Sequence, residues 1–348
     1  MQKGGMPDDL PYARKVAQHL DVPLDIVQVD PVQMANDLEK MVFQLDEPLA
    51  DPAALNVLYI SRLARENGIK VLLSGAGGDD LFTGYRRHFA LHYEKYWRFL
   101  PISIRKTLQK STHGLNQRNP LKRRIRKIFR GASLDGDEHL AKYFSWIGES
   151  NLYRLYTKDF SAELGQEPVE QPMLDFLEPL NASISDMDKM LALEQRFFLG
   201  DHNLIYTDKM SMAAGVEVRV PFLDLELIEF AASIPDEYKL RNHTGKWILK
   251  KAMEPYLPDN VIYRPKTGFG LPLRVWMKKE LRPLLSDILS TDSLNRRGLF
   301  SSQGVHQLIA DNDKGQIGAN YILFSLMCIE IWCRNYLDST GPITCSTE

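Results

Sequence analysis

Cysteine is scarce in this sequence of 348 residues: there are three, and all of them follow residue 327. They provide no framework of disulfide bonds, and Cys328 and Cys333 lie in an apolar stretch where buried thiols are more common than metal ligands. No apolar run approaches the roughly 20 residues that cross a membrane. The first residues also lack the apolar core of a signal peptide. We therefore expect a cytoplasmic protein.

The sequence also lacks a large excess of positive or of negative charge. The formal net charge is −2, so bulk charge predicts neither a nucleic acid nor a membrane as partner. Hydrophobic residues make up 44% of the chain, which is enough for the core of one large domain or two ordinary ones.

The most informative stretch is Val71–Tyr85, V-L-L-S-G-A-G-G-D-D-L-F-T-G-Y. Its start, with Ile69 and Lys70, predicts a strand buried on both faces, as in a parallel sheet. The glycines let the backbone approach a ligand, and Ser74 with the loop N–H groups can donate to phosphate. The carboxylates of Asp79 and Asp80 would repel phosphate unless a cation lies between, which suggests Mg²⁺ bound to a nucleotide. A plain glycine-rich turn before an aspartate-capped helix is equally consistent with these residues.

The chain before this loop predicts alternating helices and strands. The expected elements are a helix over 10–20, a strand over 24–29, a helix from 31 to about 43, and a helix from Asp51-Pro52 to about 67. This order is typical of βαβ units and an α/β fold with an open parallel sheet covered by helices. Two parallel strands are not a stable unit. Further strands must therefore come from later in the chain, or an opening segment is missing.

After residue 85 the pattern is mainly helical. Helices are expected near 93–100, 101–110, 185–199, 222–234, 244–256 and 321–337, with a break at Gly200-Asp201. Glu217 and Arg219 alternate with valines in a short edge strand or extended loop, where the charged residues are expected to pair and fix the fold rather than to act directly in catalysis. Six basic residues in Leu121–Arg130 fit either a nucleic-acid patch or the solvated face of an amphipathic helix.

Two lysines are candidates for phosphate contacts. Lys246 follows Gly245 at an expected helix start, and Lys266 lies in a loop stiffened by Pro265 and opened by Gly268 and Gly270. Such a loop can present a cation to developing negative charge. Simple solvent exposure remains an alternative for both lysines.

Four segments together resemble the asparagine synthetase family. They are S-G-A-G-G-D-D-L-F-T-G-Y, D-K-M-S-M-A-A-G-V-E-V-R-V-P-F-L-D, G-K-W-I-L-K-K-A and R-P-K-T-G-F-G-L-P, in the family's order and approximate spacing. Asp46-Glu47-Pro48 and the Leu10-Pro11-Tyr12-Ala13 helix are also family-like. The resemblance is to the synthetase domain of the glutamine-dependent enzymes.

The resemblance implies an ATP-pyrophosphatase fold, of the adenine nucleotide alpha hydrolase type, with a large helical C-terminal part. It implies attack of a substrate carboxylate on the α-phosphate of ATP, followed by displacement of AMP by ammonia. By the same resemblance, the residues that would line the ATP site are Ser74, Gly75, Ala76, Gly77 and Gly78. Asp79 would hold Mg²⁺, and Lys246 and Lys266 would contact phosphate as the catalytic cations.

The sequence departs from the family in two ways. The phosphate loop S-G-G-x-D-S and the glutaminase domain are absent from these residues, which predicts an N-terminally truncated sheet and weak or no activity of this chain alone. A glutaminase or an N-terminal segment would then be a separate partner. Ala76 also stands where many asparagine-forming members have glutamate, so the acceptor is either aspartate or another carboxylate, such as a sugar acid or a modified peptide.

These features predict one synthetase domain over 1–337, with a partial α/β nucleotide-binding part over 1–90 and a mainly helical part over 91–337. Residues 338–348 are expected to form a flexible tail. The expected function is ATP-dependent amide formation on a small carboxylate, without a nucleic acid or membrane partner and with a homodimer as one possible assembly. The alternative is a non-catalytic truncated homologue that acts as a binding or assembly partner.

Overall fold

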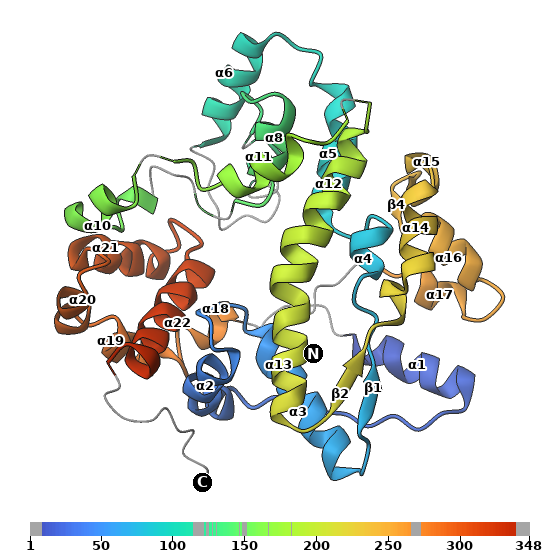
Figure 1. The fold of residues 1–348 in the computed structure, drawn as a ribbon, viewed down its shortest axis with the longest axis horizontal. Helices are drawn as coiled ribbons and strands as arrows, with labels where there is room; N and C mark the ends of the chain where they lie inside the picture. Colours follow the sequence, from blue (N-terminus) through green and yellow to red (C-terminus); the bar gives the residue numbers. More distant parts are fainter. Residues whose placement is uncertain are drawn as a thin grey trace. The chain divides into compact units, whose positions relative to one another are not determined.

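The computed structural model describes residues 9–113, 122, 125–126, 128–129, 131–145, 147, 152–165, 167–181, 183–265 and 273–338 (Figure 1). These residues are mostly helical, with one two-stranded parallel sheet and one two-stranded antiparallel sheet. They form two compact units. The first comprises Met1–Glu47, Asp51–Phe89 and Glu194–Glu280, and the second comprises Pro48–Ala50, Ala90–Leu193 and Leu281–Glu348.

The first unit holds both sheets. Its helices are α1 (Leu10–Leu20), α2 (Pro31–Leu45), α3 (Ala53–Glu66), α4 (Gly78–Leu81), the π-helix η2 (Glu194–Leu204), α13 (Ile205–Ala213), the 3₁₀ helix η3 (Pro221–Leu223), α14 (Leu225–Ser233), α15 (Asp236–Lys239), α16 (Trp247–Met253), α17 (Asp259–Ile262) and α18 (Leu273–Trp276). Its strands are β1 (Val71–Leu73), β2 (Glu217–Arg219), β3 (Leu240–Arg241) and β4 (Thr244–Gly245).

The core of the first unit lies where α13 packs against α2 and α3. The side chains there are fully or almost fully buried, among them Met34, Leu38, Leu55, Leu58 and Met210. The starts of the two early helices follow from their sequences. Asp30 accepts the Val32 N–H at 3.1 Å ahead of α2, and Asp51 accepts the Ala53 N–H at 2.8 Å ahead of α3. The predicted helices over 10–20, 31–43 and 53–67 are confirmed.

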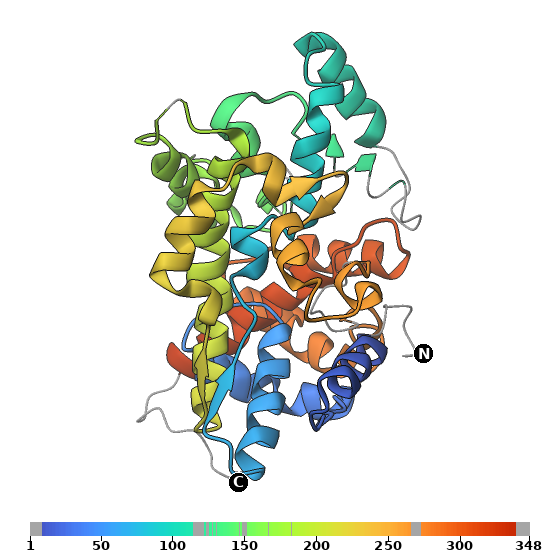
Figure 2. The ribbon, with the colours of Figure 1, turned by 90° about the vertical axis from the view of Figure 1, so that its right-hand side faces the viewer.

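The parallel sheet pairs β1 with β2, a strand from much later in the chain (Figures 1 and 2). Val71 is opposite Glu217 and Leu73 is opposite Arg219, so the segment around Glu217 is a short strand, as one of the two alternatives had it. The prediction of a strand buried on both faces is wrong, since Leu73 is 73% exposed. A sheet of two short strands has too little area to bring both of its faces under helices.

The predicted strand over 24–29 is also wrong. These residues have no strand assignment, and Leu24 and Ile26 are each 40% exposed. The sequence pattern was correct for an extended segment, but a strand exists only when a neighbour accepts and donates its backbone hydrogen bonds. Among the described residues, β1 pairs with β2 and not with this segment.

The second unit is helical. Its elements begin with the end of α5 (Arg86–Tyr93), which starts in the first unit, and continue with η1 (Glu94–Tyr96), α6 (Ile102–His113), α8 (Gly136–Lys142), α10 (Lys158–Glu163), α11 (Gln171–Leu177), α12 (Asp186–Leu193), α19 (Arg282–Ile288), α20 (Thr291–Arg297), α21 (Ser302–Asp313) and α22 (Asn320–Tyr336). Here α8, α11 and α12 pack together, and α19 packs on α22. Cys328 and Cys333 are buried in α22, as the apolar pattern indicated.

The predicted break at Gly200-Asp201 is wrong, because both residues lie inside η2. In a π-helix the backbone remains helical with wider turns, and such segments are frequent at functional sites. None of the described helices is both long and apolar enough to span a membrane. The tail residues 339–348 lie outside the described residues, and the predicted domain boundaries stay predictions.

Candidate nucleotide site

The glycine-rich loop follows β1 directly. The Ser74 N–H donates to the Arg219 carbonyl at 2.8 Å, which ties the loop to β2. The Ala76 N–H donates to Ser74 Oγ at 3.2 Å, which closes a tight turn. Gly77 then adopts φ 87° and begins α4. A side chain at Gly77 would lie 2.6 Å from Leu223 Cδ2, so glycine is required there by conformation and by space.

The central contact of the site joins the loop to α16. Lys246 Nζ lies 2.9 Å from Asp79 Oδ1, and each side chain is about one-quarter exposed. The carboxylate also lies against the α-carbon of Gly84, where a Cβ would stand only 1.5 Å from Asp79 Oδ1. The Gly84 N–H donates to the Asp79 carbonyl at 2.9 Å. A turn without a side chain at Gly84 therefore fixes the position of Asp79.

Backbone contacts hold Lys246 at this place. Its N–H donates to the Phe82 carbonyl at 2.8 Å, and its φ of 55° turns the chain from β4 into α16. A Cβ on the preceding Gly245 would stand 2.3 Å from the Thr83 carbonyl oxygen. The buried Thr83 hydroxyl in turn lies 2.9 Å from the Lys239 carbonyl. The contact between Asp79 and Lys246 thus rests on rigid backbone packing.

An apolar cluster joins the residues that follow the loop to α16. Leu81 and Phe82 after the loop pack with buried and half-buried side chains of η3, α14 and α16: Ala231, Ile234, Phe222, Leu227, Ile228, Ile248 and Leu249. The Phe82 and Phe222 rings meet edge to face with centroids 6.4 Å apart. Burial of this cluster stabilises the first unit and also fixes the two charged side chains.

Asp80 differs from its neighbour. It is 1% exposed, and its Oδ2 accepts a long hydrogen bond of 3.4 Å from the Tyr85 hydroxyl. Its buried Oδ1 has no hydrogen-bond partner within the described part of the chain. Burial, together with the charges of Glu194 and Asp79, raises the pKa of Asp80 to about 7. Asp80 therefore belongs to the interior and Asp79 to the open side of the loop.

Glu194 anchors the buried side of the site. Its carboxylate is fully buried and accepts two hydrogen bonds from the Arg87 guanidinium, while His88 Nε2 lies 3.1 Å from Oε1. Burial alone would raise the pKa of Glu194, but the hydrogen bonds from Arg87 and His88 hold it below its usual range. A paired buried carboxylate of this kind fixes η2 to the start of α5.

The chemistry of the site fits a phosphate with a metal ion. Among the described residues, no group of three or more His, Cys, Asp or Glu side chains is arranged to hold a metal. At this loop Asp79 offers a carboxylate that is about one-quarter exposed, and Mg²⁺ is commonly held by one or two carboxylates plus substrate phosphates. Lys246 would supply the positive charge that such phosphates need. The residues therefore fit a cation shared with a ligand better than a site made by the protein alone.

The structure brings some of the predicted residues together. Ser74, Gly75, Ala76, Gly77 and Gly78 form one loop that leads to Asp79, and Lys246 reaches that aspartate. Lys266 lies outside the described residues, which resume at residue 273. Sequence reasoning missed the parts played by Thr83, Gly84 and Glu194. Gly84 is part of the T-G-Y end of the loop motif, and that glycine was the available signal.

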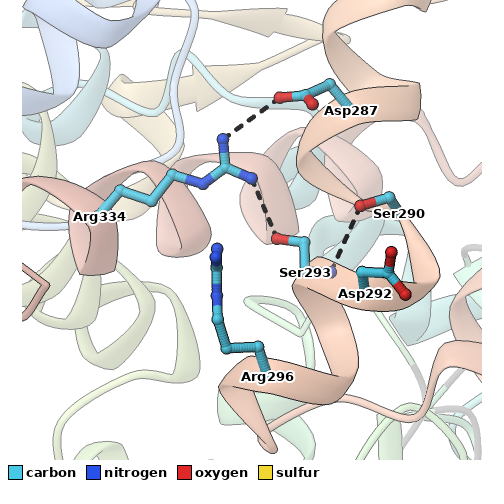
Figure 3. Close-up of a pocket in the computed structure, with 6 residues that line it drawn as sticks. All are labelled: Asp287, Ser290, Asp292, Ser293, Arg296 and Arg334. Carbon is cyan, nitrogen blue, oxygen red and sulfur yellow. Dashed lines mark hydrogen bonds and ion pairs between the residues drawn. The ribbon is translucent and has the colours of Figure 1, made fainter.

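A pocket lies in the second unit, far along the sequence from these residues. It measures about 360 Å³ and is lined by Asp287, Ser290, Asp292, Ser293, Arg296 and Arg334 (Figure 3). Arg334 donates there to Asp287 at 3.3 Å and to Ser293 at 3.0 Å. It also donates to the buried Glu330 at 3.1 Å. These contacts are those of an ion-pair network that fixes α19, α20 and α22 together.

Residues 3–334 match the family model described as Asparagine synthase. The chain is 28% identical over 328 residues to the glutamine-hydrolysing asparagine synthetase 1 of Bacillus subtilis, which covers 93% of this chain and 49% of that protein. It is 28% identical over 302 residues to a putative asparagine synthetase of Mycobacterium tuberculosis, covering 85% and 44%. It is 22% identical over 320 residues to Amidase chyE of Penicillium rubens, covering 87% and 47%.

The chain spans about half the length of these curated relatives. The match to the family model nonetheless includes the loop, Asp79, Lys246 and Lys266. The loop after β1 and the lysine at the start of α16 are thus parts of a shared domain. This chain belongs to the asparagine synthase family.

Proposed function

We propose that this chain is the synthetase part of an ATP-dependent amide-forming ligase. A carboxylate oxygen of the acceptor attacks the α-phosphorus of ATP, the bond to the β-phosphate oxygen breaks, and pyrophosphate leaves. The nitrogen of ammonia then attacks the acyl carbon, loses a proton, and AMP leaves with its phosphate oxygen. The fold that goes with this proposal is the adenine nucleotide alpha hydrolase type, to which the small parallel sheet and family membership point.

The observation that carries the proposal is the contact of Lys246 Nζ with Asp79 Oδ1 at 2.9 Å beside a glycine-rich loop. A carboxylate and an ammonium held at one loop offer both charges that a metal-bound phosphate requires. In this proposal Ser74 and the glycines border the phosphates, and Lys246 neutralises charge that develops on the leaving pyrophosphate. Lys266 would provide a second cation, a role assigned by resemblance to the family.

Mg²⁺ would be held by Asp79, and it would supply charge neutralisation between the ATP phosphates. With the Asp79 carboxylate engaged by a cation, the Lys246 ammonium would be available to a phosphate oxygen. The rigid backbone around Gly84 and Gly245 holds both side chains at this place, so little reorganisation would be needed.

The acceptor is a carboxylate, either aspartate or another one, such as a sugar acid or a modified peptide. Ala76 has no polar side chain to offer at the loop, which favours an acceptor that requires no carboxylate at this position. We test the proposal by following pyrophosphate release with ATP, Mg²⁺, ammonium and a panel of acceptors: aspartate, sugar acids and peptide carboxylates. Release that depends on one acceptor class is expected, at a low rate for residues 1–348 alone.

Nucleotide binding separates this proposal from its rival, a non-catalytic partner protein. Specific binding of ATP with Mg²⁺ raises the melting temperature by mass action. We expect a shift that is lost in Lys246→Gln and retained in Lys250→Gln, a lysine one turn further along α16. No shift in the unmodified chain, with no acceptor-dependent pyrophosphate release, would favour the partner protein.

A further inference from the structure

The second unit exposes an unusual group of large apolar side chains. Between residues 96 and 104, Tyr96 is 64% exposed, Phe99 is 77% exposed, and Ile102 and Ile104 are each 46% exposed. Phe99 is the most exposed of the large hydrophobic side chains among the described residues. Single exposed apolar residues are normal, whereas four within one short segment give a partner several apolar side chains to contact, although Ile102 and Ile104 lie on different sides of α6.

The segment around this group is strongly cationic. Residues 90–134 contain twelve lysines and arginines and one acidic residue, Glu94. Glu94 is 1% exposed and is bound by His139 at 2.6 Å and by Arg98 at 3.0 Å. The negative charge of Glu94 is therefore buried and paired. The net charge of −2 for the whole chain conceals this local excess.

Three exposed lysines lie within the apolar segment or just after it: Lys95, Lys106 and Lys110. The Lys95 ammonium lies 5.3 Å from the centre of the Tyr96 ring, so cation and aromatic side chain are immediate neighbours. We call Tyr96, Phe99, Ile102 and Ile104 together with these three lysines the aromatic–lysine patch.

Hydrogen bonds and a ring contact fix the segment that carries the patch. Arg105 of α6 donates to Asp135 at 2.9 Å and to the Ala132 carbonyl at 3.1 Å, which holds one side of the helix. The Trp97 and Phe129 rings lie 5.2 Å apart, which packs Phe129 against the same region. The fold is thus secured by residues other than those of the patch, and the exposed side chains are available for a partner.

We propose that the aromatic–lysine patch binds an anionic lipid surface. Exposed aliphatic and aromatic side chains insert between lipid headgroups, while lysines beside them attract anionic lipids. Isoleucine offers no ring for stacking on a base, so Ile102 and Ile104 favour lipid over single-stranded nucleic acid. This inference is independent of the proposed ligase activity.

Sedimentation with vesicles tests the proposal on the full chain. We expect binding to vesicles of phosphatidylcholine with about 30 mol % phosphatidylserine, little binding to phosphatidylcholine alone, and weaker binding as salt is raised. The double variant Phe99→Ser/Ile104→Ser removes apolar contact, and Lys106→Glu/Lys110→Glu reverses two charges. Each is expected to lower binding at least about tenfold.

Matched controls separate this surface from general effects. Leu225→Ser removes an apolar side chain that is 75% exposed in the first unit, and Lys278→Glu/Lys279→Glu reverses two exposed charges there. Both control variants should bind anionic vesicles like the unmodified chain. Equal binding to both kinds of vesicle, no binding to either, or equal losses in patch and control variants would overturn the proposal. Binding to an RNA that outcompetes the anionic vesicles would overturn it in favour of a nucleic-acid surface.

Discussion

Gly84 and Asp79 fit together so closely that a methyl group on the glycine would lie 1.5 Å from the aspartate Oδ1. The carboxylate occupies the space that any other residue at position 84 would fill. The end of Asp79 can rotate away, because its side chain is one-quarter exposed, but it then loses Lys246. The glycine thus determines where the carboxylate points.

For Gly84→Ala we expect a loss of ATP–Mg²⁺ affinity of at least about tenfold, because Asp79 is displaced. The free energy of unfolding should also fall, by about 1–3 kcal/mol, because the new Cβ would stand 2.7 Å from the Asp79 Cβ, which side-chain rotation does not move. Calorimetric titration and urea unfolding measure the two quantities. A variant that binds ATP normally and is as stable as the unmodified chain would contradict this account of the glycine.

Gly245→Ala tests the backbone packing beside Lys246. The new Cβ would meet the Thr83 carbonyl oxygen at 2.3 Å, and a backbone atom cannot rotate aside. We expect the free energy of unfolding to fall by about 1–3 kcal/mol. Gly75→Ala is the control, because a Cβ there has nothing within 4 Å. Equal stability of the two variants would show that the contact between Gly245 and Thr83 is not rigid.

The pKa of Asp80 predicts a pH dependence of stability. Burial and the charges of Glu194 and Asp79 raise its pKa from 3.8 to about 7 in the folded state. The contribution of Asp80 is therefore full below the unfolded pKa and is lost as the pH rises through the folded pKa. Asp80→Asn cannot ionise, so its stability relative to the unmodified chain should rise between those pH values, by up to about 1.4 kcal/mol per pH unit. Urea unfolding without Mg²⁺ at several pH values measures this difference, and a difference independent of pH would refute the assignment.

Glu194→Gln tests the buried pair below the site. Arg87 would keep its charge while its fully buried partner becomes neutral, so we expect a loss of roughly 3 kcal/mol in the free energy of unfolding. Glu217→Gln is the matched control, since Glu217 pairs with Arg219 at 2.8 Å on the surface with 55% of its side chain exposed. Its loss should stay below about 1 kcal/mol. Similar losses in both variants would mean that burial does not distinguish the two pairs.

The sequence predicted local elements better than distant contacts. The early helices were predictable because Asp30, Pro31 and Asp51 mark their starts by side-chain chemistry that needs no distant partner. The strand over 24–29 was not, because pairing depends on a neighbour that the local pattern does not contain. The π-helix through Gly200 was equally hidden, since its carboxylate Glu194 is fixed by Arg87 from a distant segment.

In the candidate site, too, the local motifs were predictable from the sequence and the distant contacts were not. Its loop was visible in the sequence as a run of glycines followed by two aspartates. The helix start at Lys246 was visible too, but its contact with Asp79 depends on packing between Gly245 and Thr83 that no local pattern reveals. The order of four segments in a known family indicated that these parts belong together. The different roles of Asp79 and Asp80 required the structure, because only burial distinguishes them.

The most direct test of the nucleotide site measures how fast single lysines react with an amine-acylating reagent, read by mass spectrometry with and without ATP and Mg²⁺. Lys246 should lose about nine-tenths of its labelling when nucleotide saturates the site, while Lys250 on the same helix keeps its rate and serves as the internal reference. Unchanged labelling of Lys246 at saturating ATP and Mg²⁺ would contradict the claim that Asp79 and Lys246 form a nucleotide site.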